Sequence, residues 1–142
     1  MRLIQVLHGW PPDQMGGTGS YVQALRQALI QAGHEVMHVS PGRWRRGGLD
    51  PVEQSGLSGW HIAQRPAWSW SDGWQRKPGL AVWSRIRAQE APDLVHVHHL
   101  SGLPLGLVRA TQEAGIPVVL TLHDYWIPCH RGQLMTDKLR PC

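Results

Sequence analysis

The sequence predicts an α/β fold in which a parallel β-sheet is covered by helices on both faces. Short apolar runs alternate with stretches of helical periodicity along the chain, a pattern typical of βαβ units. Right-handed crossovers between parallel strands place such helices on opposite faces of the sheet. The composition agrees, because 142 residues with 42% hydrophobic and 17% charged content suit one globular domain over residues 1–142.

The first strand–helix–strand unit is predicted at the start of the chain. Arg2–His8 is a short apolar strand, and helical spacing follows from Ser20, which with Thr18 offers a side chain to cap the helix start. Gly33 is placed to end this helix, and Glu35–Ser40 alternates as a second strand. The apolar residues that recur at helical spacing are Tyr21, Val22, Leu25, Leu29, Ile30 and Ala32.

Further elements continue the same alternation in the second half of the chain. A helix is predicted over Leu80–Glu90 and a strand over Leu94–Val97. A second helix over Ser101–Glu113 tolerates Pro104 in its first turn, and Pro117–Leu122 is the last strand. Together these elements predict a Rossmann-like domain.

Residues 41–79 are predicted to form a largely irregular insertion that is rich in tryptophan and arginine. Only Trp60–Ala63 is predicted as a short strand within it. Most of the net charge of +4 also lies in this segment. Its tryptophans either pack an irregular loop onto the sheet, which we favour, or stack on nucleobases or sugar rings, or contact a membrane interface. They are Trp60, Trp68, Trp70 and Trp74, with Arg65 nearby.

A glycine-rich loop lies between the first strand and the first helix. Its Gly16 and Gly17 have no side chains, so a phosphate or carboxylate can approach the backbone amides at the helix start closely. The loop lacks the G-x-G-x-x-G dinucleotide pattern, and no Walker lysine follows it. Taken alone, the loop fits an anion-binding site and a turn whose glycines serve only backbone geometry equally well.

Histidines gather where two of the predicted strands end. Strand alternation places His96 and His98 on one face of the sheet, with His99 just beyond. His123 ends the last strand and is followed by Asp124. Because ligands bind outside the carboxyl ends of parallel strands, His123 is expected to be functional. The histidines either line a polar cleft, which we favour, or ligate zinc together with aspartate and cysteine side chains.

Cysteine content and the absence of targeting signals predict a cytoplasmic protein. No apolar run approaches the roughly 20 residues of a membrane helix, and the N-terminus lacks the pattern of a signal peptide. With two cysteines and no secretion signal, a reducing compartment is the default. Cys129 and Cys142 fit two ordinary thiols, with half of a metal knuckle or a disulfide as alternatives.

Several short motifs follow one another along the chain in a specific order and spacing. They are Pro11-Pro12 and Gly16-Gly17 before Tyr21-Val22, Ala32-Gly33-His34-Glu35-Val36, Pro92-Asp93-Leu94-Val95-His96-Val97-His98, Gly115-Ile116-Pro117-Val118-Val119, Thr121-Leu122-His123-Asp124-Tyr125-Trp126, and then Cys129, Arg131-Gly132 and Cys142. With these motifs the chain resembles the N-terminal domain of family-4-like glycosyltransferases of the GT-B fold. The resemblance covers nearly the whole chain and is weakest in residues 41–79.

The resemblance implies that this domain is the acceptor-side half of a two-domain enzyme. A nucleotide-sugar would donate its sugar to an acceptor hydroxyl, usually with retention at the anomeric carbon, and no other cofactor or metal is implied. Gly16 and Gly17 would approach the donor diphosphate, where preorganised amides stabilise the charge of the leaving group. His123 would contact the transferred sugar, and we favour orientation of a hydroxyl over proton transfer.

The implied acceptor is a glycan, a lipid-linked molecule or a small molecule, and no nucleic-acid partner is expected. Asp13, His98 and His99 are the candidate acceptor contacts, and a lipid-linked acceptor would bring peripheral contact with the inner face of a membrane. Gly19 stands where many relatives carry an acidic residue. The sequence ends at Cys142, before the C-terminal donor domain with its paired glutamates, so the fragment alone is expected to be inactive.

Two other functions stay open from the sequence. A metal-dependent hydrolase would use His96, His98 and His123 as a cluster. A non-catalytic module would bind a nucleotide or carbohydrate without reaction. The transferase hypothesis requires Gly17 and His123 to open on the same side of the molecule.

Overall fold

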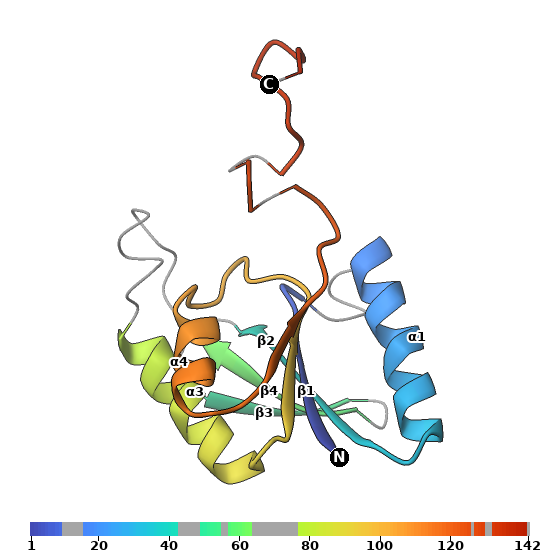
Figure 1. Cartoon of the computed structure of the whole chain (residues 1–142), viewed down its shortest axis with the longest axis vertical. Helices are drawn as coiled ribbons and strands as arrows, with labels where there is room; N and C mark the ends of the chain where they lie inside the picture. Colours follow the sequence, from blue (N-terminus) through green and yellow to red (C-terminus); the bar gives the residue numbers. More distant parts are fainter. Residues whose placement is uncertain are drawn as a thin grey trace.

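The computed structural model describes residues 1–9, 16–42, 49–54, 57–63, 77–125, 127–129 and 132–141. In this part of the chain, the strands form one six-stranded sheet in the order β3-β4-β2-β1-β5-β6 (Figure 1). The strands are β1 (Arg2–Val6), β2 (Glu35–Gly42), β3 (Leu49–Gln54), β4 (Leu57–Ala63), β5 (Leu94–Val97) and β6 (Val118–Leu120). The helices are α1 (Gly17–Gln31), α3 (Lys77–Glu90) and α4 (Leu107–Glu113).

The sheet is parallel except at one edge, where β3 pairs antiparallel with β4. β1 lies inside the sheet, and its Leu3 pairs with Val36 of β2 on one side and with Leu94 of β5 on the other. The chain leaves β1 toward the β2 side and later returns to the β5 side. The direction of the crossovers therefore reverses at β1, which makes its carboxyl end a topological switch point.

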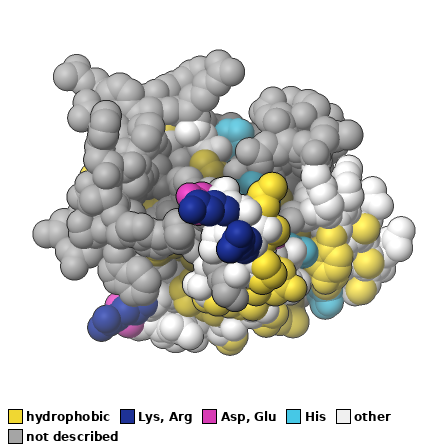
Figure 2. Space-filling model, turned by 90° about the horizontal axis from the view of Figure 1, so that it is seen from above, with side chains coloured by type: hydrophobic (Ala, Val, Ile, Leu, Met, Phe, Trp, Pro, Cys, Tyr) yellow, Lys and Arg dark blue, Asp and Glu magenta, His cyan; other side chains and the backbone are white. Residues whose placement is uncertain are grey.

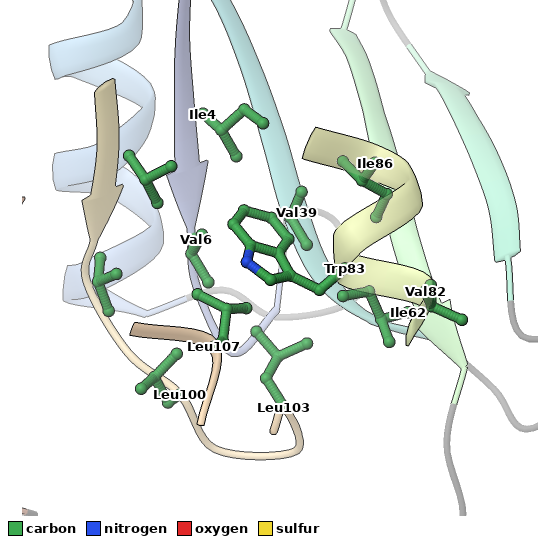
Figure 3. Close-up of a cluster of buried hydrophobic side chains, with 12 residues drawn as sticks. Ile4, Val6, Val39, Ile62, Val82, Trp83, Ile86, Leu100, Leu103 and Leu107 are labelled. Carbon is green, nitrogen blue, oxygen red and sulfur yellow. The ribbon is translucent and has the colours of Figure 1, made fainter. Parts of the chain in front are cut away.

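Helices cover both faces of the sheet, as the sequence predicts (Figure 1). α1 packs on one face through Val22, which is fully buried with Leu7. α3 and α4 cover the opposite face, where Trp83 is fully buried within the main core (Figure 3). The other buried residues of this core are Ile4, Val6, Val39, Ile62, Val82, Ile86, Val95, Val97, Leu100, Leu103 and Leu107. The predicted Rossmann-like fold is confirmed.

A buried hydrogen bond joins the two helices on this face. The Trp83 indole Nε1–H donates to Thr111 Oγ1 at 3.0 Å, and the Thr111 hydroxyl donates to the Leu107 carbonyl at 2.7 Å. All three residues are fully buried. The bond therefore satisfies an indole donor that would otherwise be removed from water without a partner.

Helix α1 begins earlier than the predicted start at Ser20. Gly16 is its N-cap residue, with an extended backbone at φ −153°, and no side chain caps it within the described residues. The prediction that Thr18 or Ser20 caps the helix is wrong, because both residues lie inside its first turn. Gly33 follows the helix at φ +85°, where glycine is favoured, and this prediction is confirmed.

The predicted helix over Ser101–Glu113 is wrong in its first half. α4 covers only Leu107–Glu113, and turns occupy most of residues 101–106. Gly102 has φ +76°, a left-handed conformation that does not continue a helix, which explains the late start. β5 has its predicted bounds, whereas β1 and β6 are shorter than predicted.

The prediction of a largely irregular segment over residues 41–79 is wrong at β3, whereas the predicted short strand at Trp60–Ala63 is confirmed and extended by β4. β3 and β4 pair with each other, and β4 contains the predicted short strand at Trp60. β3 carries Asp50 and Pro51, residue types that are uncommon in strands but tolerated at the edge of a sheet.

Trp60 packs onto the domain, but from strand β4 of the sheet and not from an irregular loop as favoured from the sequence. It is half-buried against the main core, and its indole Nε1–H donates to Glu90 Oε1 at 2.8 Å. The other tryptophans of this segment lie outside the described residues: Trp68, Trp70 and Trp74. Their packing, stacking or membrane contact stays a prediction.

Candidate functional site

The carboxyl ends of β1, β5 and β6 meet at one edge of the sheet. The parallel pairing continues beyond the strands, since the His98 N–H donates to the Val6 carbonyl at 2.8 Å. The Thr121 N–H likewise donates to the Val97 carbonyl at 3.0 Å. His98 therefore follows β5 directly beside the end of β1, at the switch point. Figure 2 looks onto this end of the molecule and shows histidine side chains at its surface.

An imidazole pair links the segments that follow β5 and β6. His98 Nδ1 lies 3.1 Å from His123 Nε2, a hydrogen bond whose direction depends on which nitrogen carries the proton. His98 is fully buried, whereas His123 is partly exposed. His96 packs against His98 with ring centroids 4.0 Å apart, and its Nε2 is hydrogen-bonded to Thr121 Oγ1 at 2.7 Å. The predicted shared face of His96 and His98 is confirmed.

Tyr21 connects helix α1 to this imidazole pair. Its ring centroid lies 5.0 Å from that of His123 and 5.9 Å from that of His98, in edge-to-face geometry. Gly17 precedes Tyr21 by four residues, which is about 6 Å along a helix axis. The glycine pair and His123 therefore lie at the same edge of the molecule.

Packing against the described residues does not explain why glycine stands at positions 16 and 17. A Cβ atom at Gly16 or Gly17 would meet no described atom within 4 Å. Gly16 is in extended backbone that any residue adopts, so conformation does not require glycine there either. The first intrahelical bond runs from the Ser20 N–H to the Gly16 carbonyl at 3.1 Å, which leaves the earlier amides without a helical acceptor. These features favour anion approach over a purely conformational role.

A second contact group surrounds His99. Its Nδ1 accepts a hydrogen bond from the Ser101 backbone N–H at 3.0 Å, so neutral His99 carries its proton on Nε2. That Nε2 lies 3.4 Å from Asp124 Oδ2. His8, just after β1, packs edge-on against His99 with ring centroids 4.4 Å apart. His99 is therefore oriented as a donor toward Asp124.

Burial lowers the pKa of four histidines at this edge, His8, His96, His98 and His99, and keeps them uncharged at neutral pH. Desolvation lowers the pKa of His98 from 6.5 to about 3, with repulsion from neighbouring histidines as a smaller cause. Desolvation is also the main cause that lowers the pKa of His8, His96 and His99. Asp124 opposes the lowering at His8 and His99, because its negative charge favours an imidazolium. The rings therefore act as neutral donors and acceptors.

The predicted site residues differ in how they lie relative to the surface of this edge. The glycine pair and His123 lie at the same edge of the sheet. His98 is fully buried beneath this surface, so we no longer assign it the direct acceptor contact predicted from the sequence. His99 is 9% exposed and is bonded to its neighbours. Asp13 lies outside the described residues.

Sequence reasoning missed two residues of this edge as site residues. Tyr21 was expected on the apolar helix face, but it is 46% exposed and contacts His123. Its position one turn after the glycine pair is the signal that identifies it. His8 was predicted only as the end of a strand, and the carboxyl end of the strand before a glycine loop is the corresponding signal.

No three His, Cys, Asp or Glu side chains are arranged to hold a metal ion among the described residues. Nitrogens of the predicted cluster are instead engaged in hydrogen bonds, His96 Nε2 with Thr121 Oγ1 and His98 Nδ1 with Nε2 of His123 within the cluster itself. The hydrolase hypothesis therefore has no geometric support in the described ranges. Cys129 is buried, and Cys142 lies outside them, so the pairing alternatives stay predictions.

A separate open groove of about 550 Å³ lies near the amino-terminal ends of β1 and β2. Arg2 and Glu35 line it, and they form an exposed ion pair with Nε and Oε2 2.9 Å apart. The groove contains none of the histidines of the carboxyl-terminal edge, so we assign it no part in the function proposed below.

The chain is a Rossmann-like α/β domain. Histidine side chains gather at the carboxyl ends of β1, β5 and β6, at the switch point of the sheet. Residues 15–140 match Glycosyltransferase Family 4. The chain belongs to this family. No curated protein matches the chain in a sequence search.

Solved structures show the same fold. The catalytic domain of starch synthase IV from Arabidopsis thaliana, bound to ADP and acarbose, is similar to this chain with a TM-score of 0.56 and 16% sequence identity. The similarity covers 87% of this chain and 34% of the starch synthase chain. The chain thus spans about a third of the length of that catalytic-domain chain, and the predicted likeness to the GT-B fold is confirmed.

Proposed function

We propose that this chain is the acceptor-side domain of a glycosyltransferase that moves a sugar from a nucleotide-sugar to an acceptor hydroxyl, with retention at the anomeric carbon. The observation that carries the proposal is that the start of α1 and His123 lie at the same edge, since the Tyr21 ring in the second turn of α1 contacts the His123 ring. Family membership supports this reaction class. The ADP in the starch synthase structure supports it too, because a nucleoside diphosphate is what a nucleotide-sugar releases.

The first turn of α1 is the proposed contact for the donor diphosphate. No described atom lies within 4 Å of a Cβ built at Gly16 or Gly17, so within this part of the chain an anion can reach the backbone. The first amides of a helix have no intrahelical acceptor, and they and the helix dipole favour negative charge there. The diphosphate gains charge as it leaves the sugar. Donors already in place therefore stabilise the transition state more than the bound donor. The proposal includes no other cofactor and no metal.

His123 is the proposed contact for the transferred sugar. Its ring is partly exposed and is held by the hydrogen bond to His98 and the contact with Tyr21. A ring fixed in this way can orient a sugar hydroxyl, and correct orientation of the reacting groups is itself a large contribution to catalysis.

The acceptor is proposed to bind beside His99 and Asp124, on the same edge. Asp13 stays a predicted contact, and the acceptor class stays a glycan, a lipid-linked molecule or a small molecule. None of the helices in the described ranges combines the length and the apolar character that crossing a membrane requires. Peripheral membrane contact and a cytoplasmic location stay predictions.

A second α/β domain is proposed to hold most of the donor nucleotide. Support comes from the starch synthase, of which this chain matches 34%. Because half of the proposed binding surface would belong to that domain, we expect residues 1–142 alone to be inactive in transfer.

The test compares His123→Ala with His34→Ala in the complete enzyme that includes the second domain. His34 lies beyond the C-terminal end of α1, so its replacement controls for loss of an imidazole away from the site. Release of nucleoside diphosphate is measured with a panel of nucleotide-sugars, and circular dichroism monitors folding. We expect His123→Ala to lose about 100-fold in turnover and His34→Ala to keep it. Unchanged turnover in His123→Ala contradicts the role of His123, and no release from any donor contradicts the reaction class.

A further inference from the structure

We infer that His98 is a positioning residue that holds His123 in the tautomer with its proton on Nδ1. In this tautomer, the nitrogen of His123 that does not face His98 can donate a hydrogen bond to a substrate oxygen but cannot accept a proton. The identity of that substrate rests on the proposed function. The tautomer itself is a property of the protein without substrate.

The surroundings of His98 decide where its own proton lies. His98 is fully buried and neutral at neutral pH, so it carries one N–H. Its Nε2 is buried and has no hydrogen-bond partner among the described residues, whereas its Nδ1 lies 3.1 Å from His123 Nε2. Unpaired N–H groups are rarer in protein interiors than unpaired acceptors, because a buried donor without a partner is costly. The proton is therefore assigned to Nδ1 of His98.

The direction of the hydrogen bond between the two rings follows from this assignment. His98 Nδ1–H donates, so His123 Nε2 accepts with its lone pair. A neutral imidazole has one N–H, which leaves the proton of His123 on Nδ1. A flip of the His123 ring would remove the bond to His98 and disturb the contact with Tyr21, so the structure favours one orientation.

The tautomer determines which chemistry His123 can perform. A general base needs a free lone pair within reach of the proton that it removes. Nδ1 of His123 is already protonated, and the lone pair of Nε2 is occupied by His98. His123 is therefore a hydrogen-bond donor that orients a sugar hydroxyl. In the reverse arrangement, in which His123 donates to His98, Nδ1 would be unprotonated and base catalysis would be possible.

The two arrangements are distinguished by the protonation pattern of the rings. Long-range proton–nitrogen correlation spectra of the full chain with isotope-labelled histidine report which nitrogen of each ring is protonated. At neutral pH we expect protonated Nδ1 in both His98 and His123. Protonated Nε2 in His123 overturns the inference. Because no substrate is present, failure of the proposed transfer reaction would leave this result unaffected.

His98→Asn and His98→Leu form a matched pair for the role of His98. The asparagine side-chain amide places a donor near the position of the histidine Nδ1–H, whereas leucine has no donor. We expect His98→Asn to retain the His123 pattern and His98→Leu to lose it. The same His123 pattern in both variants, or its loss in His98→Asn, overturns the inference. If His98→Leu does not fold, the native protein and His98→Asn still decide.

Discussion

Replacement of Gly17 by alanine separates the ligand role of the glycine pair from its role in folding. Gly17 is the first residue of α1, and a Cβ there would meet no described atom within 4 Å. Alanine restricts the unfolded chain without strain in the folded helix. Gly17→Ala is therefore expected to raise the free energy of unfolding by about 0.4–1 kcal/mol.

The same methyl group is expected to weaken diphosphate binding. A phosphate oxygen that accepts a hydrogen bond from a backbone amide lies about 2.9 Å from the nitrogen, so the approach leaves little room for an added side chain. A hydrogen bond to a charged group contributes about 1.5–3 kcal/mol. Loss of one such bond corresponds to roughly 10- to 150-fold weaker binding.

Gly33→Ala is the matched control at the other end of the same helix. Gly33 has φ +85°, where an alanine is strained, so this variant should lose about 1–2 kcal/mol of stability and keep its affinity. Chemical denaturation gives the stability of each variant, and calorimetric titration of the complete enzyme with a nucleoside diphosphate gives the affinity. Wild-type affinity in Gly17→Ala would refute the anion-binding role, and lower stability would show that the fold needs this glycine.

Three further predictions test the core and the histidines. Thr111→Val removes the acceptor of the buried Trp83 indole, so the unfolding free energy measured in urea should fall by about 1–3 kcal/mol; an unchanged value would contradict the role of this bond. Gly59→Ala places a Cβ 2.5 Å from both Nδ1 and the backbone oxygen of His38, so overpacking should cost about 1–3 kcal/mol in the same measurement, and full stability would show that the backbone of β2 or β4 can shift to make room. Burial lowers the pKa of His98 from 6.5 to about 3. As the pH falls, the imidazole of His98 is therefore protonated in the unfolded chain before it is protonated in the folded one. The free energy of unfolding should decrease as the pH falls from about 6.5 to about 3. His98→Asn should lack this part of the decrease, whereas a pH profile equal to that of the native protein would contradict it.

The parallel part of the sheet was predictable because its strands are short apolar runs between helical segments. The bounds of β5 were predicted correctly for this reason. β3 was missed because its pairing with β4, and not its composition, makes it a strand. Asp50 and Pro51 are poor strand formers that an edge position tolerates, and a local pattern does not show which strand is at the edge.

The candidate site was predictable in its position but not in its contacts. The general rule for parallel sheets placed the glycine pair and His123 at one edge. The burial of His98 and the contact of Tyr21 with His123 depend on strand register and on how α1 lies across the sheet. The start of α1 was missed because capping propensity favoured Thr18 or Ser20, whereas the helix begins after a glycine.

The direction of the crossovers reverses at β1, and this arrangement affects how related proteins can diverge in evolution. Side chains around His123 come from stretches far apart in the chain, near His8, Tyr21 and His98, while the strands beneath share one hydrogen-bonded ladder. A connecting loop can therefore be lengthened or exchanged without altering that ladder. Relatives can diverge in what they recognise while the scaffold is inherited unchanged.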